Sequence, residues 1–208
     1  MKPELNFPNV ITAARILLTP LFVWLVLSQD GVRVQVAALI FLLAAISDWY
    51  DGWYARRYNA MSAFGRFFDP LADKVLIGAA FFVFVTLGPF DLWMVLVIVG
   101  RDLVVTVLRV IADLKHQPVV TSRLAKWKTA LQLVFLWYVV LIFTLKNVIW
   151  IREAITVARL DALLSPAIVV PAMLLLTLLS LVTAGQYLYE NRHILRVLTN
   201  GSFARTTL

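Results

Sequence analysis

The sequence contains no cysteine and only two histidines among its 208 residues. Without cysteine, disulfide bonds, thiolate metal sites and cysteine nucleophiles are excluded. The histidines, His116 and His193, fall in loop or terminal regions, and we assign neither of them a role. The opening residues MKPELNFPNV carry one lysine and no small-residue cleavage site, so we expect neither a signal peptide nor a transit sequence.

Acidic residues are also scarce, with 12 Asp and Glu against 19 Lys and Arg, a net charge of +7. Hydrophobic residues make up 62% of the chain, above the roughly 45–50% of soluble domains. Apolar stretches recur throughout, with no internal repeat and no low-complexity tract. We expect one integral membrane domain over residues 1–208 and no nucleic-acid partner. The positive charge suits anionic lipids or an anionic substrate, and it equally suits the orientation of a membrane protein.

Two of the six apolar segments are too short to cross a membrane alone. Val34–Ile46 and Val75–Leu87 have 13 residues each, and a spanning helix needs about 20. They become long enough only if one helix continues through Asp48 and Asp51 and the other begins near Asp69. We therefore predict an all-α integral membrane protein, a bundle of six transmembrane helices. The expected helices cover roughly residues 9–28, 34–57, 69–87, 91–114, 125–146 and 166–190.

Helices two and three are expected to be antiparallel neighbours joined by about a dozen residues. This arrangement places four aspartates at one membrane face: Asp48, Asp51, Asp69 and Asp73. With the N-terminus inside, eleven Lys and Arg residues lie in inner segments and four in outer ones, so the positive-inside rule puts that face in the cytoplasm. The Lys146–Arg159 loop weakens this contrast, and we do not interpret the Lys146–Pro166 connection. The inner residues are Lys2, Arg56, Arg57, Arg66, Lys115, Arg123, Lys126, Lys128, Arg192, Arg196 and Arg205. The outer ones are Arg33, Lys146, Arg152 and Arg159.

The aspartates are spaced so that they share helix faces. At 100° per residue, one stripe about 140° wide holds two carboxylates, two small residues and one guanidinium. That stripe consists of Asp48, Asp51, Gly52, Ala55 and Arg56. Asp69 and Asp73, four residues apart, share a face of the next helix. The spacing therefore predicts four carboxylates that converge on one pocket.

Each aspartate taken alone has a structural explanation. Asp69 followed by Pro70 is typical of a helix cap with proline at the first helical position. Asp73 could pair with Lys74 or favour a helix N-terminus. Four carboxylates together near hydrocarbon need a compensating charge, because each buried ion is costly. Clustered carboxylates without soft ligands select Mg²⁺ or Mn²⁺.

The same residues resemble a family signature. At eight fixed positions the chain is similar to the CDP-alcohol phosphotransferases, through the string Asp48-x2-Asp51-Gly52-x2-Ala55-Arg56-x8-Gly65-x3-Asp69-x3-Asp73. The resemblance implies a six-helix, homodimeric membrane enzyme that displaces CMP from a CDP-linked lipid or alcohol with two metal ions. It implies that the four aspartates hold two divalent cations, Mg²⁺ or Mn²⁺, with Asp69 as the bridge. Asp73 would also take the proton of the attacking hydroxyl.

The resemblance also implies a nucleotide site. Gly52 and Ala55 would leave room for cytidine, Arg56 would bind pyrophosphate, and Gly65 would let the backbone approach closely. Ser62 resembles the nucleotide-binding Ser or Thr of the family.

The N-terminal FPNVITAARILLTP is similar to the opening of phosphatidylglycerophosphate synthases, which implies that Asn9, Thr12 and Arg15 contribute to the CDP-lipid site. Arg15 could instead extend to the lipid headgroups.

Basic residues on helices four and five bear on the acceptor alcohol. Arg101 and Arg109 lie within about 80° of each other, and Arg101 is near the middle of its apolar segment. Asp102 points about 100° away from Arg101, so an internal ion pair would need a carboxylate on another helix. The functional interpretation is a site for an acceptor phosphate, which arginine binds in a bidentate manner. Lys126 and Lys128 would join it from the start of helix five, and we interpret one of the two as topological charge only.

Both RDLVVTVLR and AKWKT resemble bacterial phosphatidylglycerophosphate synthases. That resemblance implies phosphatidyl transfer from CDP-diacylglycerol to the sn-1 hydroxyl of glycerol 3-phosphate, with release of CMP, in the bacterial cytoplasmic membrane. Its active site would face the cytoplasm, and membrane lipids would surround the homodimer. A cardiolipin synthase, or another family member with a different acceptor, remains an alternative. A cation transporter is a more remote alternative, because it would need acids near the bilayer midplane and broken helices.

Overall fold

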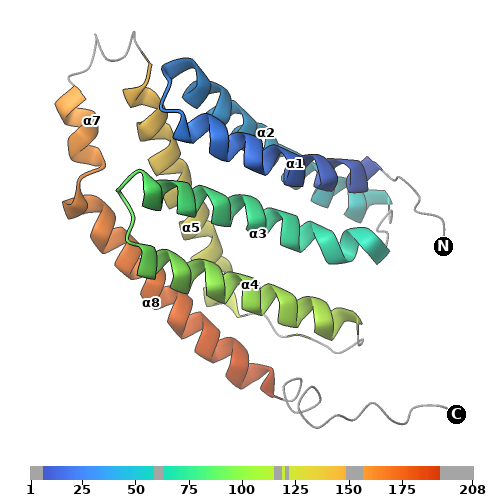
Figure 1. The fold of residues 1–208 in the computed structure, drawn as a ribbon. Helices are drawn as coiled ribbons and strands as arrows, with labels where there is room; N and C mark the ends of the chain where they lie inside the picture. The colour runs from blue at the N-terminus through green and yellow to red at the C-terminus, as the bar shows by residue number, and fades with distance from the viewer. Residues whose placement is uncertain (1–6, 59–62, 115–118, 120–121, 149–156, 193–208) are drawn as a thin grey trace, which may run out of the picture.

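A computed structural model describes residues 7–58, 63–114, 119, 122–148 and 157–192. Within these ranges all regular structure is helical, so the all-helical class expected from the sequence is confirmed. The described residues form six long helices and one short one, whose arrangement can be followed in Figure 1. They are α1 (Phe7–Leu27), α2 (Gly31–Tyr58), α3 (Ala63–Thr86), α4 (Leu92–Leu114), α5 (Arg123–Lys146), α7 (Val157–Leu163) and α8 (Pro166–Glu190).

The start of α3 differs from the prediction. The helix begins at Ala63, so Asp69 and Pro70 lie inside it and do not cap it. Asp69 and Pro70 therefore do not mark the start of this helix, and the interpretation of the pair as a helix cap was wrong. The apolar pattern becomes continuous only after Lys74, and a helix that begins in the polar segment before it leaves no hydropathy signal.

The long helices pack in a closed ring. Helix α1 packs against both α2 and α3, and α3 packs against α4. Helix α8 packs against both α4 and α5, and α5 returns to α2. Helix α1 therefore packs against both of the helices that carry the aspartates, and it fixes their positions relative to each other. Figure 1 shows α2 and α3 running in opposite directions, with the end of α2 and the start of α3 at the same end of the bundle.

The connection that the sequence left uninterpreted contains the short helix α7, which packs against α5. The Tyr138 hydroxyl donates to the carbonyl of Leu163 over 2.7 Å. Lys146, at the end of α5, forms an ion pair with Asp161 of α7. This helix therefore turns the chain back from α5 into α8.

Aromatic rings pack within the hydrophobic core, toward the end of the bundle opposite the aspartates. The ring of Phe41 lies 5.4 Å from Phe22 and 4.9 Å from Trp137. Phe84 lies 5.6 Å from both Phe90 and Phe143. These rings join α1, α2, α3 and α5 with the α3–α4 turn. Burial of this apolar surface leaves the other half of the bundle for polar side chains.

Helix α8 has small polar residues on its buried side and aliphatic residues on its exposed side. Thr177, Ser180 and Thr183 are buried, alongside apolar residues such as Met173 and Leu176. Its outward side carries exposed aliphatic residues, among them Leu178 at 60% and Leu175 at 55% exposure. Small polar residues at helix contacts and leucines outside are typical of a helix in lipid.

By length and composition, two segments of the described chain could cross a membrane. They are Arg123–Lys146 and Val157–Glu190, the latter covering α7 and α8. Ala13–Leu27 and Gly31–Ser47 are shorter apolar helical segments. These helices are consistent with a membrane protein.

Gly31 marks a close approach between α2 and α5. Asp30 caps α2, because its Oδ1 accepts a hydrogen bond of 3.0 Å from the Arg33 backbone N–H. A Cβ on Gly31 would lie only 2.6 Å from the carbonyl oxygen of Asn147, just after α5. That oxygen belongs to the backbone and cannot rotate away.

We expect Gly31→Ala to destabilise the protein by about 1–3 kcal/mol, the usual cost of overpacking. The measurement is the melting temperature of the detergent-solubilised protein. Gly185→Ala in α8 is the matched control, because no described atom lies within 4 Å of the added Cβ. It should leave the melting temperature unchanged or raise it, since alanine is the better helix former. Equal effects of the two changes would contradict the close approach.

Candidate functional site

The four aspartates lie on helical backbone at one end of the bundle. Asp48 and Asp51 are in the last part of α2, and Asp69 and Asp73 are in the first half of α3. Helical spacings of three and four keep each pair on one face of its helix. Figure 1 shows the two segments at the same end of the molecule. Of the four side chains, that of Asp73 is described, and it is half-buried.

Several expected site residues fall where no side chain is described. Ser62 lies outside the described residues altogether. For nine others only the helical backbone is described: Asn9, Thr12, Asp48, Asp51, Gly52, Ala55, Arg56, Gly65 and Asp69. Among the side chains that are described, no three His, Cys, Asp or Glu converge. The described side chains do not include three of the four aspartates, so the fit to a metal rests on donor chemistry. Carboxylates alone, paired by helical spacing, suit a hard divalent cation.

Arg15 is enclosed in the bundle. It lies on α1, the helix that supports both aspartate-bearing helices, and only 2% of it is exposed. Its backbone carbonyl accepts a 2.9 Å hydrogen bond from the Thr19 hydroxyl. A guanidinium that extended to lipid headgroups would be exposed, so the burial of Arg15 argues against that alternative.

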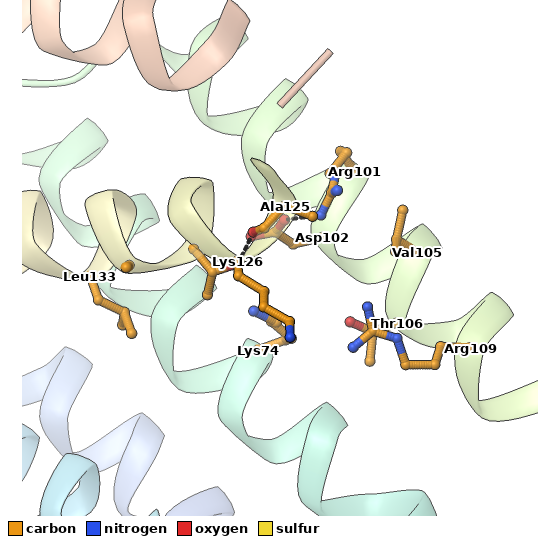
Figure 2. Close-up of a pocket in the computed structure, with 11 residues that line it drawn as sticks. Lys74, Arg101, Asp102, Val105, Thr106, Arg109, Ala125, Lys126 and Leu133 are labelled. Atoms are coloured by element: carbon orange, nitrogen blue, oxygen red, sulfur yellow. Dashed lines mark hydrogen bonds and ion pairs between the residues drawn. The ribbon is translucent and has the colours of Figure 1, made fainter. Parts of the chain in front are cut away.

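A pocket of about 420 Å³ opens between α3, α4 and α5. Figure 2 shows the side chains of Lys74, Lys126 and Arg109 around it, one from each helix. Arg101 adds a fourth cation, and Asp102 is the one acidic residue among the lining side chains described. The described lining thus has a formal charge of +3, from four cations and one carboxylate. Such a surface attracts an anion with more than one charge.

The pocket is built from two matching helical stripes. The residues that line it from α4 and α5 follow the same spacing of i, i+1, i+4, i+5 and i+8. On α4 they are Arg101, Asp102, Val105, Thr106 and Arg109; on α5 they are Ala125, Lys126, Thr129, Ala130 and Leu133. Three of the four residues expected at an acceptor phosphate site, Arg101, Arg109 and Lys126, line this pocket.

Sequence reasoning missed Lys74, Thr106 and Thr129, which also line the pocket. The stripe spacing could have identified the two threonines, because each lies on the same face as an expected cation. Lys74 had been considered only as a partner of Asp73. Its place beside the pocket required knowledge of how α3 packs on α4.

Lys128 differs from the expectation. Its side chain is completely buried and does not line the pocket. Its Nζ donates hydrogen bonds of 2.6 Å to Asp102 Oδ1 and of 2.6 Å to Gln132 Oε1. A lysine stays charged at such a site only with partners of this kind, and removal of one partner of a buried pair costs about 3–5 kcal/mol.

Asp102 also accepts a 3.1 Å hydrogen bond from Nη1 of Arg101. The expectation that Asp102 points too far away to pair with its neighbour was therefore wrong. Helical phase fixes only the Cα–Cβ direction, and the long arginine side chain folds back to the carboxylate. Within the described residues, Nε and Nη2 of Arg101 have no hydrogen-bond partner.

We expect inorganic phosphate to stabilise the solubilised protein by occupying this pocket. At 100 times its dissociation constant, a ligand adds about 2.7 kcal/mol to stability. The phosphate-induced rise in melting temperature should fall to less than about half in Lys74→Met and in Arg109→Met. Lys146→Met removes the same charge at the other end of α5 and should keep the full rise. Equal rises in all variants would place the phosphate elsewhere.

Comparison with known proteins agrees with these features. Residues 5–160 match the family model of the CDP-alcohol phosphatidyltransferases. A Bacillus subtilis protein named CDP-diacylglycerol–glycerol-3-phosphate 3-phosphatidyltransferase is 39% identical over 141 residues, which cover 62% of this chain and 73% of the relative. Proteins of the same name from Rickettsia prowazekii and Rickettsia bellii are 38% and 36% identical. They cover 64% and 73% of this chain, and 74% and 83% of their own lengths.

The family match extends over well more than half of the chain and includes every expected aspartate. It also includes the cationic pocket. The chain belongs to the CDP-alcohol phosphatidyltransferase family.

Proposed function

We propose that the protein transfers the phosphatidyl group of CDP-diacylglycerol to glycerol 3-phosphate, forming phosphatidylglycerophosphate and CMP. The observation that carries the choice of acceptor is the cationic pocket between α3, α4 and α5. The names of the relatives point to the same two substrates.

The charge of the pocket favours a phosphate monoester as the acceptor. Glycerol 3-phosphate carries close to two negative charges at neutral pH, against which the pocket presents four cations. Phosphatidylglycerol, the acceptor of the alternative cardiolipin synthase, carries a phosphodiester with a single negative charge at the corresponding position of its glycerol. Such a diester would offset less of the charge of Lys74, Arg109 and Lys126 than a phosphate monoester does.

The aspartates are proposed to perform the chemistry. Asp48, Asp51, Asp69 and Asp73 would hold two divalent cations, Mg²⁺ or Mn²⁺, which when bound offset the charge of the pyrophosphate and of the departing CMP. Asp73 takes the proton from the sn-1 hydroxyl of glycerol 3-phosphate. The hydroxyl oxygen then bonds to the phosphorus of the phosphatidyl group, and the P–O bond to CMP breaks, with its electron pair leaving on CMP.

Helix α3 links the two substrates. Asp73 and Lys74 are consecutive on it, and Lys74 lines the cationic pocket. An acceptor whose phosphate is held there would have its free hydroxyl within reach of the aspartate end of the bundle. Holding two reactants in this way converts a bimolecular step into an effectively unimolecular one.

The CDP-lipid is proposed to bind along α1 and α2. Gly52 and Ala55 give space to the cytidine, Arg56 binds the pyrophosphate, and Asn9 and Arg15 complete the site from α1. The burial of Arg15 supports this role, because a buried guanidinium beside the aspartate-bearing helices favours an anionic ligand. Thr12, Ser62 and Gly65 belong to the same proposed site.

We further propose that the six long helices span the bacterial cytoplasmic membrane. The aspartate end faces the cytoplasm, as the excess of Lys and Arg at that end favours. Exposed leucines on α8 would then face lipid. The homodimer implied by the family resemblance is part of the same proposal.

The function is tested by product identification. Purified protein with labelled CDP-diacylglycerol and Mg²⁺ should form labelled phosphatidylglycerophosphate when glycerol 3-phosphate is supplied. Phosphatidylglycerol as the sole acceptor should give no labelled product. Labelled cardiolipin in the second reaction, with no product in the first, would replace our proposal with the cardiolipin synthase alternative.

We expect Asp69→Asn to lower kcat by at least about 10²-fold, the scale of losing an acid–base or electrostatic contributor. Asparagine keeps the size of the side chain but removes its charge. Mg²⁺ or Mn²⁺ should raise the melting temperature of the wild type and raise it less in this variant. The control Asp91→Asn changes an exposed aspartate just before α4 and should retain full activity. Normal turnover of Asp69→Asn would remove Asp69 from the reaction.

A further inference from the structure

A chain of buried polar contacts runs from the pocket wall on α4 across to α5. Asp102 Oδ1 accepts from Arg101 Nη1 over 3.1 Å and from Lys128 Nζ over 2.6 Å. Lys128 Nζ also donates to Gln132 Oε1 over 2.6 Å. Lys128, Gln132 and Asp102 are 0%, 2% and 4% exposed. Arg101 and Asp102 line the pocket, whereas Lys128 and Gln132 lie behind it.

Charge balance explains why Lys128 lies beside Asp102, behind the residues that line the pocket. Asp102 alone beside Arg101 would cancel the arginine charge and leave little attraction for an anion. With Lys128 on the same carboxylate oxygen, the three side chains together keep a net charge of +1. Lys128 therefore offsets Asp102, and the positive charge of Arg101 stays available to a ligand.

The geometry also fixes which edge of the guanidinium lacks a hydrogen-bond partner. Arg101 uses Nη1 for Asp102, and within the described part of the chain its Nε and Nη2 have no partner. Nε and Nη2 form the side-on fork with which arginine binds two oxygens of one phosphate group. An arginine held through Nη1 thus leaves this buried fork without a hydrogen bond among the described residues, and the oxygens of a bound phosphate would supply the missing acceptors.

We propose that Lys128 and Asp102 are positioning residues, which hold Arg101 so that its Nε–Nη2 edge binds the acceptor phosphate. Lys128 acts through Asp102 and does not contact the substrate. This inference rests on the proposed function for the identity of the phosphate compound, glycerol 3-phosphate. It assigns Gln132 the supporting role of second acceptor for the Lys128 ammonium group.

A double-mutant cycle on the purified full-length enzyme tests the indirect role. Lys128→Met and Arg101→Met should each raise the KM for glycerol 3-phosphate by about tenfold or more, the effect of losing a charge-assisted hydrogen bond. The KM for CDP-diacylglycerol should change less than about twofold. The double variant should be no worse than Arg101→Met, because Lys128 has no route to the substrate without Arg101. Effects that multiply would mean that Lys128 binds the phosphate directly.

A neutral pair separates positioning from plain stability. Asp102→Leu combined with Lys128→Met removes both buried charges and also the oxygen that accepts from Arg101 Nη1. Replacement of a buried ion pair by apolar residues of similar volume is often neutral for folding. This variant should melt near the wild type and still show the raised KM for glycerol 3-phosphate. Lys128→Arg, which keeps the charge, should recover most of the KM. If the neutral pair recovers both melting temperature and KM, the pair is structural only and our proposal is wrong.

The measurements also distinguish failure of the proposed function from failure of the positioning role. If the wild type makes no product from glycerol 3-phosphate, the acceptor is wrong, and the same variants are compared by their melting-temperature rise with inorganic phosphate. The positioning role then predicts a reduced rise in Lys128→Met, in Arg101→Met and in the neutral pair. An unreduced rise in the neutral pair would contradict it in that experiment also.

Discussion

The ion pair between Asp102 on α4 and Lys128 on α5 is the contact on which the polar half of the bundle depends. Both side chains are almost fully buried, and an unpaired charge at such a depth would be costly. Helices α4 and α5 are each packed on α8, and this pair joins them directly across the base of the cationic pocket. The same carboxylate holds Arg101, so one buried contact sets both the separation of two helices and the orientation of a pocket residue.

The two ends of the bundle differ in composition, one apolar and the other charged. Aromatic rings around Phe41 and Phe84 fill the end opposite the aspartates, where helices α1 to α5 pack by apolar contact. The other end contains buried Arg15, the cationic pocket and the aspartate-bearing segments of α2 and α3. Rigid packing at one end allows charged groups to be held at the other, since the cost of burying them is met by contacts elsewhere. Helix α8 closes the ring, with both small polar and apolar residues inside and leucines outside.

Much of the architecture was predictable, and the exceptions have physical causes. Apolar runs located all six long helices, because burial in lipid or in a helical core demands them. The start of α3 was misplaced because residues 63–74 are helical without being continuously apolar, so hydropathy could not detect them. The short helix α7 was missed because its seven residues are too few for a helical period to stand out. Lys128 was assigned to the substrate because its spacing from Lys126 could not tell a pocket wall from a helix interface.

The sequence by itself determined the helical class, the family and the residues that carry the proposed chemistry, because the spacing of the aspartates is a property of one or two adjacent helices. The tertiary structure alone decided which cations meet. Lys74, Arg109 and Lys126 come from three helices, and only the packing of α3, α4 and α5 brings them to one pocket. It also decided that Lys128 faces Asp102 and away from the pocket, since burial and partners depend on neighbours that are 26 residues distant in the chain.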